Sequence, residues 1–556
     1  VDAAWLHMED PTNLMMVTGV MTFDRQPNLD HLKAILEHRL LKYRRFRQRV
    51  VEPTLSIGLP QWEDDPAFDL NSHLHRVALP EPGGHEALQE MVSDLMSTPL
   101  DFAKPLWQSH VVENCGDGGA IICRLHHCIA DGIALMQVLL SMTDLSRNAK
   151  WPQAKPKKTK RPSTLLGRAY DAFVKPATNV FTTARQLTER VWQEGVESLS
   201  NPGPLLELAQ QGTDVATTTG RLLLLPPDPQ TVFKGKLGVA KKAAWSKPLP
   251  LKEVKAIKNA TGTTVNDVLI SALAGGLRHY LVNRGEPVDG LNFRAFVPVN
   301  IRGQEQIEDL GNKFGLVFLS LPIYLDDPLE RLLEVQRRMN ALKNSPEAVV
   351  AFGILGAMGL TPTDVQKVIV QMFAMKATAV MTNVPGPQIP LYLAGAQIKE
   401  MMFWVPQSGK VGLGTSIFSY AGSVYLGIVT DKGLVADPEA IIDGFYEEYR
   451  QLLALAQAVA AAPDAPAAAE TAVPAVPTES AYPLPSAAPS AADLTQIKGI
   501  GPKTAAYLAT HGITTVAQLA AAEPAALQLL LADGGRFRLL NPATWPAQAQ
   551  ALLDDA

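Results

Sequence analysis

A segment of Ala, Pro, Ser and Thr at residues 461–492 divides the chain into two parts that must fold separately. The segment holds seven prolines and few large apolar side chains. Such a composition offers too little apolar surface to bury, and proline cannot donate a backbone hydrogen bond. We therefore expect a flexible, extended linker between a large body and a small helical module at residues 493–556.

The body before the linker alternates apolar runs of helical and strand-like period, which is the pattern of an α/β fold. Residues 1–149 form the first domain that we expect. Within it, Met15–Phe23 and Gly119–His127 are typical of strands, and Leu29–Tyr43 carries apolar residues on one helical face. A further helix is expected over Ile133–Met142.

A second α/β domain is expected at residues 236–460, with a helix over Thr264–Asn283 and a strand hairpin over Val411–Thr430. Residues 150–235 are rich in Thr, Gly and Pro, and we interpret them as a connector between the two domains. Residues 150–162 hold six cations and no acid. This basic run is either a solvated loop or a contact for anionic lipid headgroups.

The composition excludes several classes of protein. The formal net charge of −5 gives no overall basic field for nucleic acid. Three cysteines, an odd number without zinc-site spacing, argue against a disulfide scaffold and fit a reducing cytoplasm. Every apolar stretch of eighteen residues is interrupted by a charge, so we expect no transmembrane helix and a cytoplasmic location.

The most informative motif is the run HHCIADG at residues 126–132, which follows an apolar strand and precedes an apolar helix. Adjacent strand residues point to opposite faces, so His126 and His127 are not expected to share one metal. One histidine should face a cleft, where it could take a proton from an alcohol, and the other should pack inside. Asp131 is a candidate helix N-cap, and Gly132 would allow a tight turn. Alternatively, both histidines are merely hydrogen-bonded polar groups at a strand end.

Other catalytic chemistries find no support in the sequence. The chain has no Gly-x-Ser-x-Gly nucleophile elbow and no Gly-x-x-x-x-Gly-Lys-Ser/Thr phosphate loop. The two Gly-x-Gly sequences, at residues 412–414 and 499–501, are too short to be a dinucleotide fingerprint.

The HHCIADG run resembles the HHxxxDG signature of the coenzyme A-dependent acyltransferase superfamily, which includes chloramphenicol acetyltransferase and peptide-synthetase condensation domains. The order and spacing of further short motifs across residues 1–455 resemble the bacterial wax ester synthase/diacylglycerol acyltransferase family. Cys128 departs from this pattern, where a small residue such as Ala is expected. The motifs are the opening DAAWLHME at residues 2–9, Pro105-Leu106-Trp107, Asn266-Asp267-Val268, Pro298-Val299-Asn300-Ile301-Arg302 and Asn383-Val384-Pro385-Gly386.

The resemblance implies two chloramphenicol-acetyltransferase-like α/β domains that form a channel at their interface. His127 would remove the proton of an acceptor hydroxyl, the alkoxide would attack the thioester of acyl-CoA, and coenzyme A would leave. This chemistry needs no covalent acyl-enzyme, no metal and no cofactor beyond acyl-CoA as a substrate. Proximity of the two substrates and oriented donors to the oxyanion would lower the barrier.

Roles for the other motif residues follow from the same resemblance. Asp131 would pair with Arg302 of the second domain and hold the histidine loop. Asn266 is a candidate oxyanion donor, or simply a polar residue beside Asp267 at a helix start. Pro105 and Trp107 would pack beneath the channel or form its wall, and Asn383 would mark a strand exit that could face the acceptor.

Three functions therefore compete. The first is transfer of a long-chain acyl group from acyl-CoA to a fatty alcohol or a diacylglycerol, by an enzyme bound peripherally to the inner membrane or lipid inclusions. The second is another HHxxxDG reaction, such as a condensation-type acyl transfer. The third is an inactive binding scaffold, which the intact HHxxxDG run disfavours.

The tail contains IKGIGPKTA at residues 497–505, which resembles a helix-hairpin-helix module. Such a module offers backbone amides to a nucleic-acid phosphate. However, residues 493–556 hold four Lys and Arg against five Asp and Glu, a formal charge of −1. Because phosphate binding draws on cations, we expect no nucleic acid as a partner, but a protein contact or self-association.

Overall fold

The computed structural model describes residues 2–52, 60–152, 222, 224–300, most of 310–461 and parts of 494–554. Within 310–461, positions 313, 344, 346, 359–362 and 408 are not described. The expected linker, the basic run from residue 153 onward, most of the connector and Arg302 therefore lie outside the described residues. The chain divides into two compact units, Val1–Ala465 and Pro466–Ala556, and each is considered by itself.

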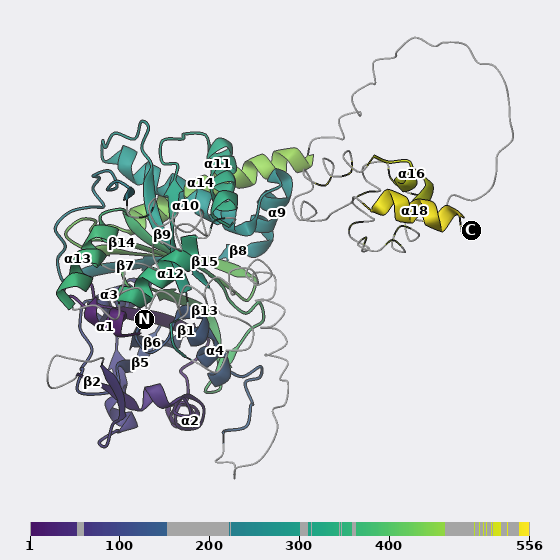
Figure 1. Cartoon of the computed structure of the whole chain (residues 1–556). Coiled ribbons are helices and arrows are strands. Elements are labelled where there is room, and N and C mark those ends of the chain that lie inside the picture. The colour runs from purple at the N-terminus through teal and green to yellow at the C-terminus, as the bar shows by residue number, and fades with distance from the viewer. Residues whose placement is uncertain are drawn as a thin grey trace, which may run out of the picture. The chain divides into compact units, whose positions relative to one another are not determined.

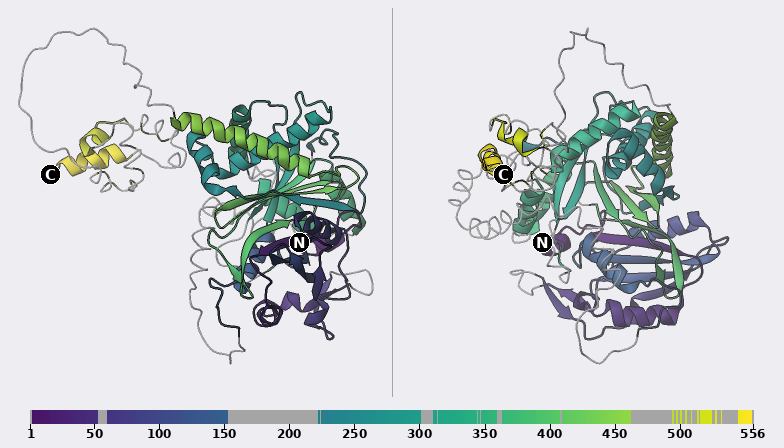
Figure 2. Two further views of the ribbon diagram at one scale, coloured as in Figure 1. Left: turned by 180° about the vertical axis from the view of Figure 1, so that it is seen from behind. Right: turned by 90° about the vertical axis from the view of Figure 1, so that its right-hand side faces the viewer.

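The first sheet of the larger unit contains six strands in the order β12-β13-β1-β6-β5-β4. Its pairs are antiparallel except for β4 with β5. The strands are β1 (Met16–Phe23), β4 (Leu74–Ala78), β5 (Trp107–Cys115), β6 (Gly118–His126), β12 (Tyr392–Leu393) and β13 (Ala396–Trp404). Strand β13, drawn in green, comes from the later half of the chain yet runs beside the purple β1 (Figure 2). In this pair, Thr18 lies opposite Trp404. The later half therefore completes the sheet that carries the histidine motif.

The second sheet has the order β10-β9-β11-β14-β15-β7, and β8 pairs with β15. Its strands are β7 (Lys241–Trp245), β8 (Leu249–Pro250), β9 (Phe293–Asn300), β10 (Phe314–Leu321), β11 (Ala379–Pro385), β14 (Leu413–Tyr420) and β15 (Ser423–Asp431). The hairpin expected over Val411–Thr430 is present as β14 and β15. Its turn residues Ala421 and Gly422 both have positive φ, 46° and 82°, which favours a type I′ turn.

Helices pack around the two sheets (Figure 1). They are α1 (Asp2–His7), α2 (Leu29–Ile35), α3 (His85–Met96), α4 (Gly132–Met142), α9 (Leu251–Thr261), α10 (Val265–Asn283), α11 (Pro328–Lys343), α12 (Glu347–Met358), α13 (Thr363–Ala374) and α14 (Glu439–Ala461). The central helix α10 is buried along most of its length against α14. No helix in the described parts of the chain combines the length and apolarity needed to cross a membrane.

One expected helix is wrong in detail. The helix expected over Leu29–Tyr43 is α-helical only to Ile35 and continues as a π-helical turn over Leu36–Leu40. The Leu41 amide donates to the carbonyl of Leu36 at 2.9 Å, one residue wider than an α-helical bond. This turn packs against α4, and Arg39 within it donates at 3.0 Å to the carbonyl of Met142, at the end of α4 away from the histidine motif.

The smaller unit is helical in its described parts, as expected. Thr515 and Gln518 form a capping box at the start of α16 (Val516–Ala520), and α18 covers Trp545–Asp554. A small apolar core joins Leu494, Ile497, Ile500, Leu508, Leu519, Leu527, Leu531, Trp545 and Ala549.

Candidate active site

The histidine motif begins where β6 ends between β1 and β5. His126 lies opposite Met16 in the sheet, and its amide donates to the carbonyl of Leu106 at 2.9 Å. The His127 amide donates to the carbonyl of Met15 at 2.7 Å. These bonds hold the backbone of both histidines from two sides, so the loop leaves the sheet in a fixed direction.

His126 lies inside the protein and is fully buried. Its Nδ1 accepts a hydrogen bond from the Cys128 amide at 3.1 Å, so the ring proton belongs on Nε2. That Nε2 lies 3.5 Å from a carboxylate oxygen of Glu9, close enough for an ionic contact but without hydrogen-bond alignment. Phe102 meets the ring edge-on at 5.7 Å. His126 thus stabilises the loop from the protein interior.

His127 is held between aromatic rings and is only 4% exposed. Its imidazole stacks on the Trp5 indole, and Phe314 lies 5.6 Å away on another side. Burial lowers the pKa of His127 to about 4, an effect that the negative charge of Asp131 partly offsets. The imidazole is therefore neutral near pH 7 and able to accept a proton. The sequence predicted one histidine facing a cleft, but Trp5 covers one face of the His127 ring and both histidines are buried.

Asp131 caps the N-terminus of α4, as expected. Its Oδ1 accepts from the Ala134 amide at 2.9 Å, and the side chain is buried. The proposed ion pair of Asp131 with Arg302 falls outside the described residues and stays a prediction. Gly132 differs from expectation. It is the first residue of α4, its φ is not positive, and an added Cβ would meet nothing within 4 Å. It borders a cavity and makes no tight turn.

The resemblance gave no role to three residues that hold the motif from outside it. Arg45 donates to the carbonyls of Cys128 at 3.1 Å and Ile129 at 3.0 Å, and Asn312 donates to the carbonyl of His127 at 2.9 Å. Asp2 contacts both of them. Asp2 belongs to the opening motif at residues 2–9, but the sequence assigned it no role of its own. Arg45 and Asn312 carry no local signal, because their contacts span more than eighty residues of sequence.

Cys128, the departure from the family pattern, is fully buried. Burial raises the pKa of its thiol well above the usual range. The thiol is therefore protonated and packs like a small apolar side chain, so it is no candidate nucleophile.

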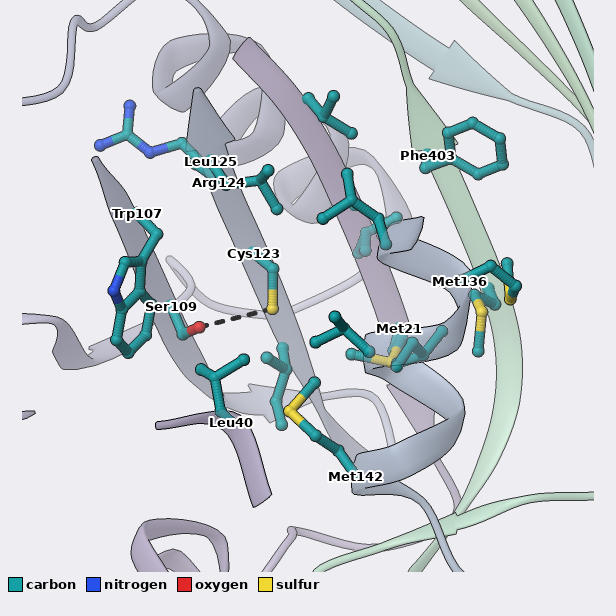
Figure 3. A pocket seen from close by; sticks show the side chains of 18 of the residues that line it. Met21, Leu40, Trp107, Ser109, Cys123, Arg124, Leu125, Met136, Met142 and Phe403 are labelled. Carbon is teal, nitrogen blue, oxygen red and sulfur yellow. Dashed lines mark hydrogen bonds between the residues drawn. The ribbon is translucent and has the colours of Figure 1, made fainter. Parts of the chain in front are cut away.

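An apolar cavity of about 160 Å³ lies between β1, β5, β6, α4 and β13 (Figure 3). Trp107 lines it and donates from Nε1 to the carbonyl of Phe46 at 2.9 Å, while Pro105 is buried just before β5. Ser109 and Cys123 face each other across two strands, with 3.4 Å between oxygen and sulfur. The Pro-Leu-Trp motif thus both packs under the site and forms part of a wall.

A smaller cavity of about 60 Å³ adjoins the outer side of Trp5. Met8, Phe296, Phe318, Ala351 and Phe373 are among the other side chains that line it. Because Trp5 lines this cavity and also stacks on His127, an apolar chain held there would end close to the imidazole.

The Asn-Asp and Asn-Val-Pro-Gly motifs meet each other rather than His127. The Asn383 amide donates to Asn266 Oδ1 at 2.5 Å, and both residues line a cavity of about 360 Å³ beside α10. Asp267 closes a capping box with Thr264 at the start of α10 and is fully buried. Within the described residues, no hydrogen bond links these side chains to His127. Asp267 is a structural residue of the helix start, and the oxyanion role of Asn266 stays a prediction.

Comparison with known proteins identifies the parts of the chain. Residues 1–269 match the wax ester synthase/diacylglycerol acyltransferase catalytic domain, and residues 310–453 match the C-terminal domain of the same family. Residues 494–553 match the RS2/RL21/YNQ2 helix-hairpin-helix domain.

Full-length relatives agree with this assignment. The chain is 27% identical over 470 residues to the probable diacylglycerol O-acyltransferase tgs1 of Mycobacterium tuberculosis, covering 82% of this chain and 96% of that one. It is 29% identical over 448 residues to the probable diacylglycerol O-acyltransferase tgs2 of the same organism, covering 77% and 92%.

Solved structures share the fold. The wax ester synthase/diacylglycerol acyltransferase from Marinobacter aquaeolei VT8 is 21% identical with a TM-score of 0.56, covering 82% of this chain and 98% of that one. The first condensation domain of the calcium-dependent antibiotic synthetase is 15% identical with a TM-score of 0.52, covering 82% and 94%. Because both family domains match in order, the chain belongs to the wax ester synthase/diacylglycerol acyltransferase family and is an O-acyltransferase.

Proposed function

We propose that His127 is the general base for transfer of a long-chain acyl group from acyl-CoA to the hydroxyl of a fatty alcohol or a diacylglycerol. The observation that carries this proposal is an imidazole that burial keeps neutral near pH 7. It stacks on Trp5, which lines one apolar cavity, while Leu125 and Gly132 on either side of its loop line another. A neutral imidazole in an apolar setting is suited to act as a base that takes the hydroxyl proton at the moment when the alcohol attacks.

The steps balance without a covalent enzyme intermediate. His127 takes the hydroxyl proton, the oxygen forms a bond to the thioester carbon, and a tetrahedral oxyanion results. The carbon–sulfur bond then breaks, and the imidazolium returns its proton to the departing thiolate of coenzyme A. Burial around His127 strengthens the electrostatic interactions of these charges.

The two cavities suggest where the chains lie. The larger one contains Leu125 and Gly132, which flank the His127 loop, and its lining is almost wholly apolar. We assign it to the acyl chain of acyl-CoA. The smaller one, beside Trp5, is assigned to the aliphatic part of the acceptor.

The decisive experiment measures thiol release from palmitoyl-CoA with hexadecanol or a diacylglycerol. His127→Ala should reduce the rate by on the order of 10²–10⁴ and keep the fold. His126→Ala is the matched control, because His126 lies under the loop and should change stability more than rate. Near-normal thiol release by folded His127→Ala would exclude His127 as the base.

We also propose that the enzyme binds membranes or lipid inclusions peripherally. Its substrates are apolar, and a basic run at residues 150–162 could contact anionic headgroups. Salt washing should release at least part of the protein from a membrane fraction, whereas release by detergent alone would contradict an electrostatic contact.

The helix-hairpin-helix tail is proposed to bind a protein, either a second copy or another protein at the lipid surface. Its net charge of −1 supports this, since phosphate contacts need a surplus of Lys and Arg.

A further inference from the structure

Asn312 lies just before β10, is 3% exposed, and reaches the histidine loop from the later half of the chain. Its Nδ2 group donates to two acceptors, the His127 carbonyl at 2.9 Å and Asp2 Oδ1 at 2.8 Å. The Asn312 backbone amide also donates to Asp2 Oδ1, at 3.1 Å. Both amide hydrogens are used, so the orientation of the side-chain amide is fixed.

This orientation leaves two buried polar atoms without hydrogen-bond partners, Oδ1 of Asn312 and Nδ1 of His127. A buried polar atom without a partner costs on the order of 1–3 kcal/mol, so two together call for an explanation. One atom is an acceptor and the other can carry a proton. The His127 backbone carbonyl, and after it the Asn312 side chain, raise the pKa of His127 against the effect of burial.

Asp2 joins this amide to a second support of the loop. Its other carboxylate oxygen lies 2.8 Å from Nη1 of Arg45. Arg45 in turn donates to the carbonyls of Cys128 and Ile129. One carboxylate therefore connects two side chains that hold three successive carbonyls, those of residues 127 to 129.

We infer that Asn312 is a positioning residue for His127: by donating to the His127 carbonyl, it holds the imidazole in the orientation in which Nε2 is the base. Asp2 and Arg45 keep the amide and the loop in register. This inference rests on the proposed base role of His127. When Nε2 takes a proton, the His127 carbonyl and the Asn312 side chain both favour the imidazolium, since each raises the pKa of His127.

The test compares Asn312→Ala with Asn13→Ala in the full chain. Asn13 is also a buried asparagine that bonds to a distant part of the chain, but it donates to the carbonyls of Gly409 and Val411 and not to that of His127. We expect Asn312→Ala to lower kcat by about 10- to 100-fold, with KM for palmitoyl-CoA within about threefold of the original. Asn13→Ala, corrected for the folded fraction, should keep kcat within about threefold.

A pH profile supplies a readout that a purely structural role would not move. Asn312→Asp puts a carboxylate beside His127 and should shift the acidic limb of kcat/KM upward by about one pH unit or more. The other titratable groups around His127 are Asp131, His126, Asp2 and Glu9, and none of them is changed. If Asn312→Asp does not fold, Asn312→Ala still decides the question.

The His127→Ala background separates the two proposals. There Asn312→Ala should leave the residual rate unchanged, because a positioning residue has nothing left to position. A kcat within threefold in Asn312→Ala alone, or an equal further loss in the double variant, would overturn the role of Asn312. Full activity in His127→Ala would overturn the base itself.

Discussion

The indole of Trp5 stacks on the imidazole of His127, with ring centroids 4.2 Å apart and planes inclined by 24°. Trp5 comes from α1, and His127 from the loop after β6. Burial is the largest cause of the low pKa of His127, and the indole contributes to it by covering one face of the imidazole. Helix α1 thus helps to keep the proposed base neutral.

Trp5→Ala should therefore shift the acidic limb of kcat/KM to higher pH, toward the ordinary histidine value near 6.5. Removing the indole admits water and weakens the desolvation that keeps the imidazole neutral. Trp404→Ala is a matched control, because Trp404 is equally buried but belongs to β13. If the pH profile is the same in the unmodified protein, Trp5→Ala and Trp404→Ala, the stack has no electrostatic effect.

Stability should fall as the pH drops from about 6.5 to about 4. Burial lowers the pKa of both His127 and His110 to about 4, so the unfolded chain binds more protons in this range. Full protonation of each histidine would lower the free energy of unfolding by on the order of 3 kcal/mol. Above pH 7 neither histidine would lower it. Urea unfolding at pH 7.5 and 4.5 measures the loss. His110→Gln should make the loss of unfolding free energy between these two pH values smaller. If the loss is unchanged, His110 is already protonated in the folded protein.

The two cavities should control different substrates. Ser109→Leu adds bulk to the larger cavity, where the Ser109 hydroxyl contacts the Cys123 thiol, and should shift the donor preference from hexadecanoyl-CoA toward shorter chains. Ala351→Leu fills the smaller cavity and should shift the preference among alcohols instead. Initial rates with donors and alcohols of six to sixteen carbons test both. If Ser109→Leu changed only the alcohol preference, the assignment would be reversed.

Local sequence signals predicted the elements around the site well. The strand before HHCIADG, the Asp131 cap and the Ala421-Gly422 turn each depend on residues a few positions apart. Alternation of apolar residues marks a strand but not its partner, so the pairing of β13 with β1 could not be foreseen.

The supports of the site were less accessible to sequence reasoning. Asp2, Arg45 and Asn312 are single polar residues brought together by the fold, and no period or spacing records such contacts. The pairing of Asn383 with Asn266 joins two motifs that were known separately, but their mutual contact depends on how α10 packs on β11. Motifs indicated which residues matter, and only the fold decides what they touch.

Removing residues 466–556 should leave acyl transfer in solution nearly unchanged. Neither the full chain nor the truncated chain should bind DNA. The larger unit ends at Ala465 and holds both sheets and the histidine motif, while the smaller unit has an apolar core of its own. The tail carries four Lys and Arg against five Asp and Glu, too few cations to neutralise several phosphates at physiological salt. Thiol release by the truncated and full chains measures the first expectation. A gel shift of duplex DNA by the full chain, at low micromolar protein and near-physiological salt, measures the second. A clear shift that disappears on truncation would assign nucleic acid, rather than protein, as the partner of the tail.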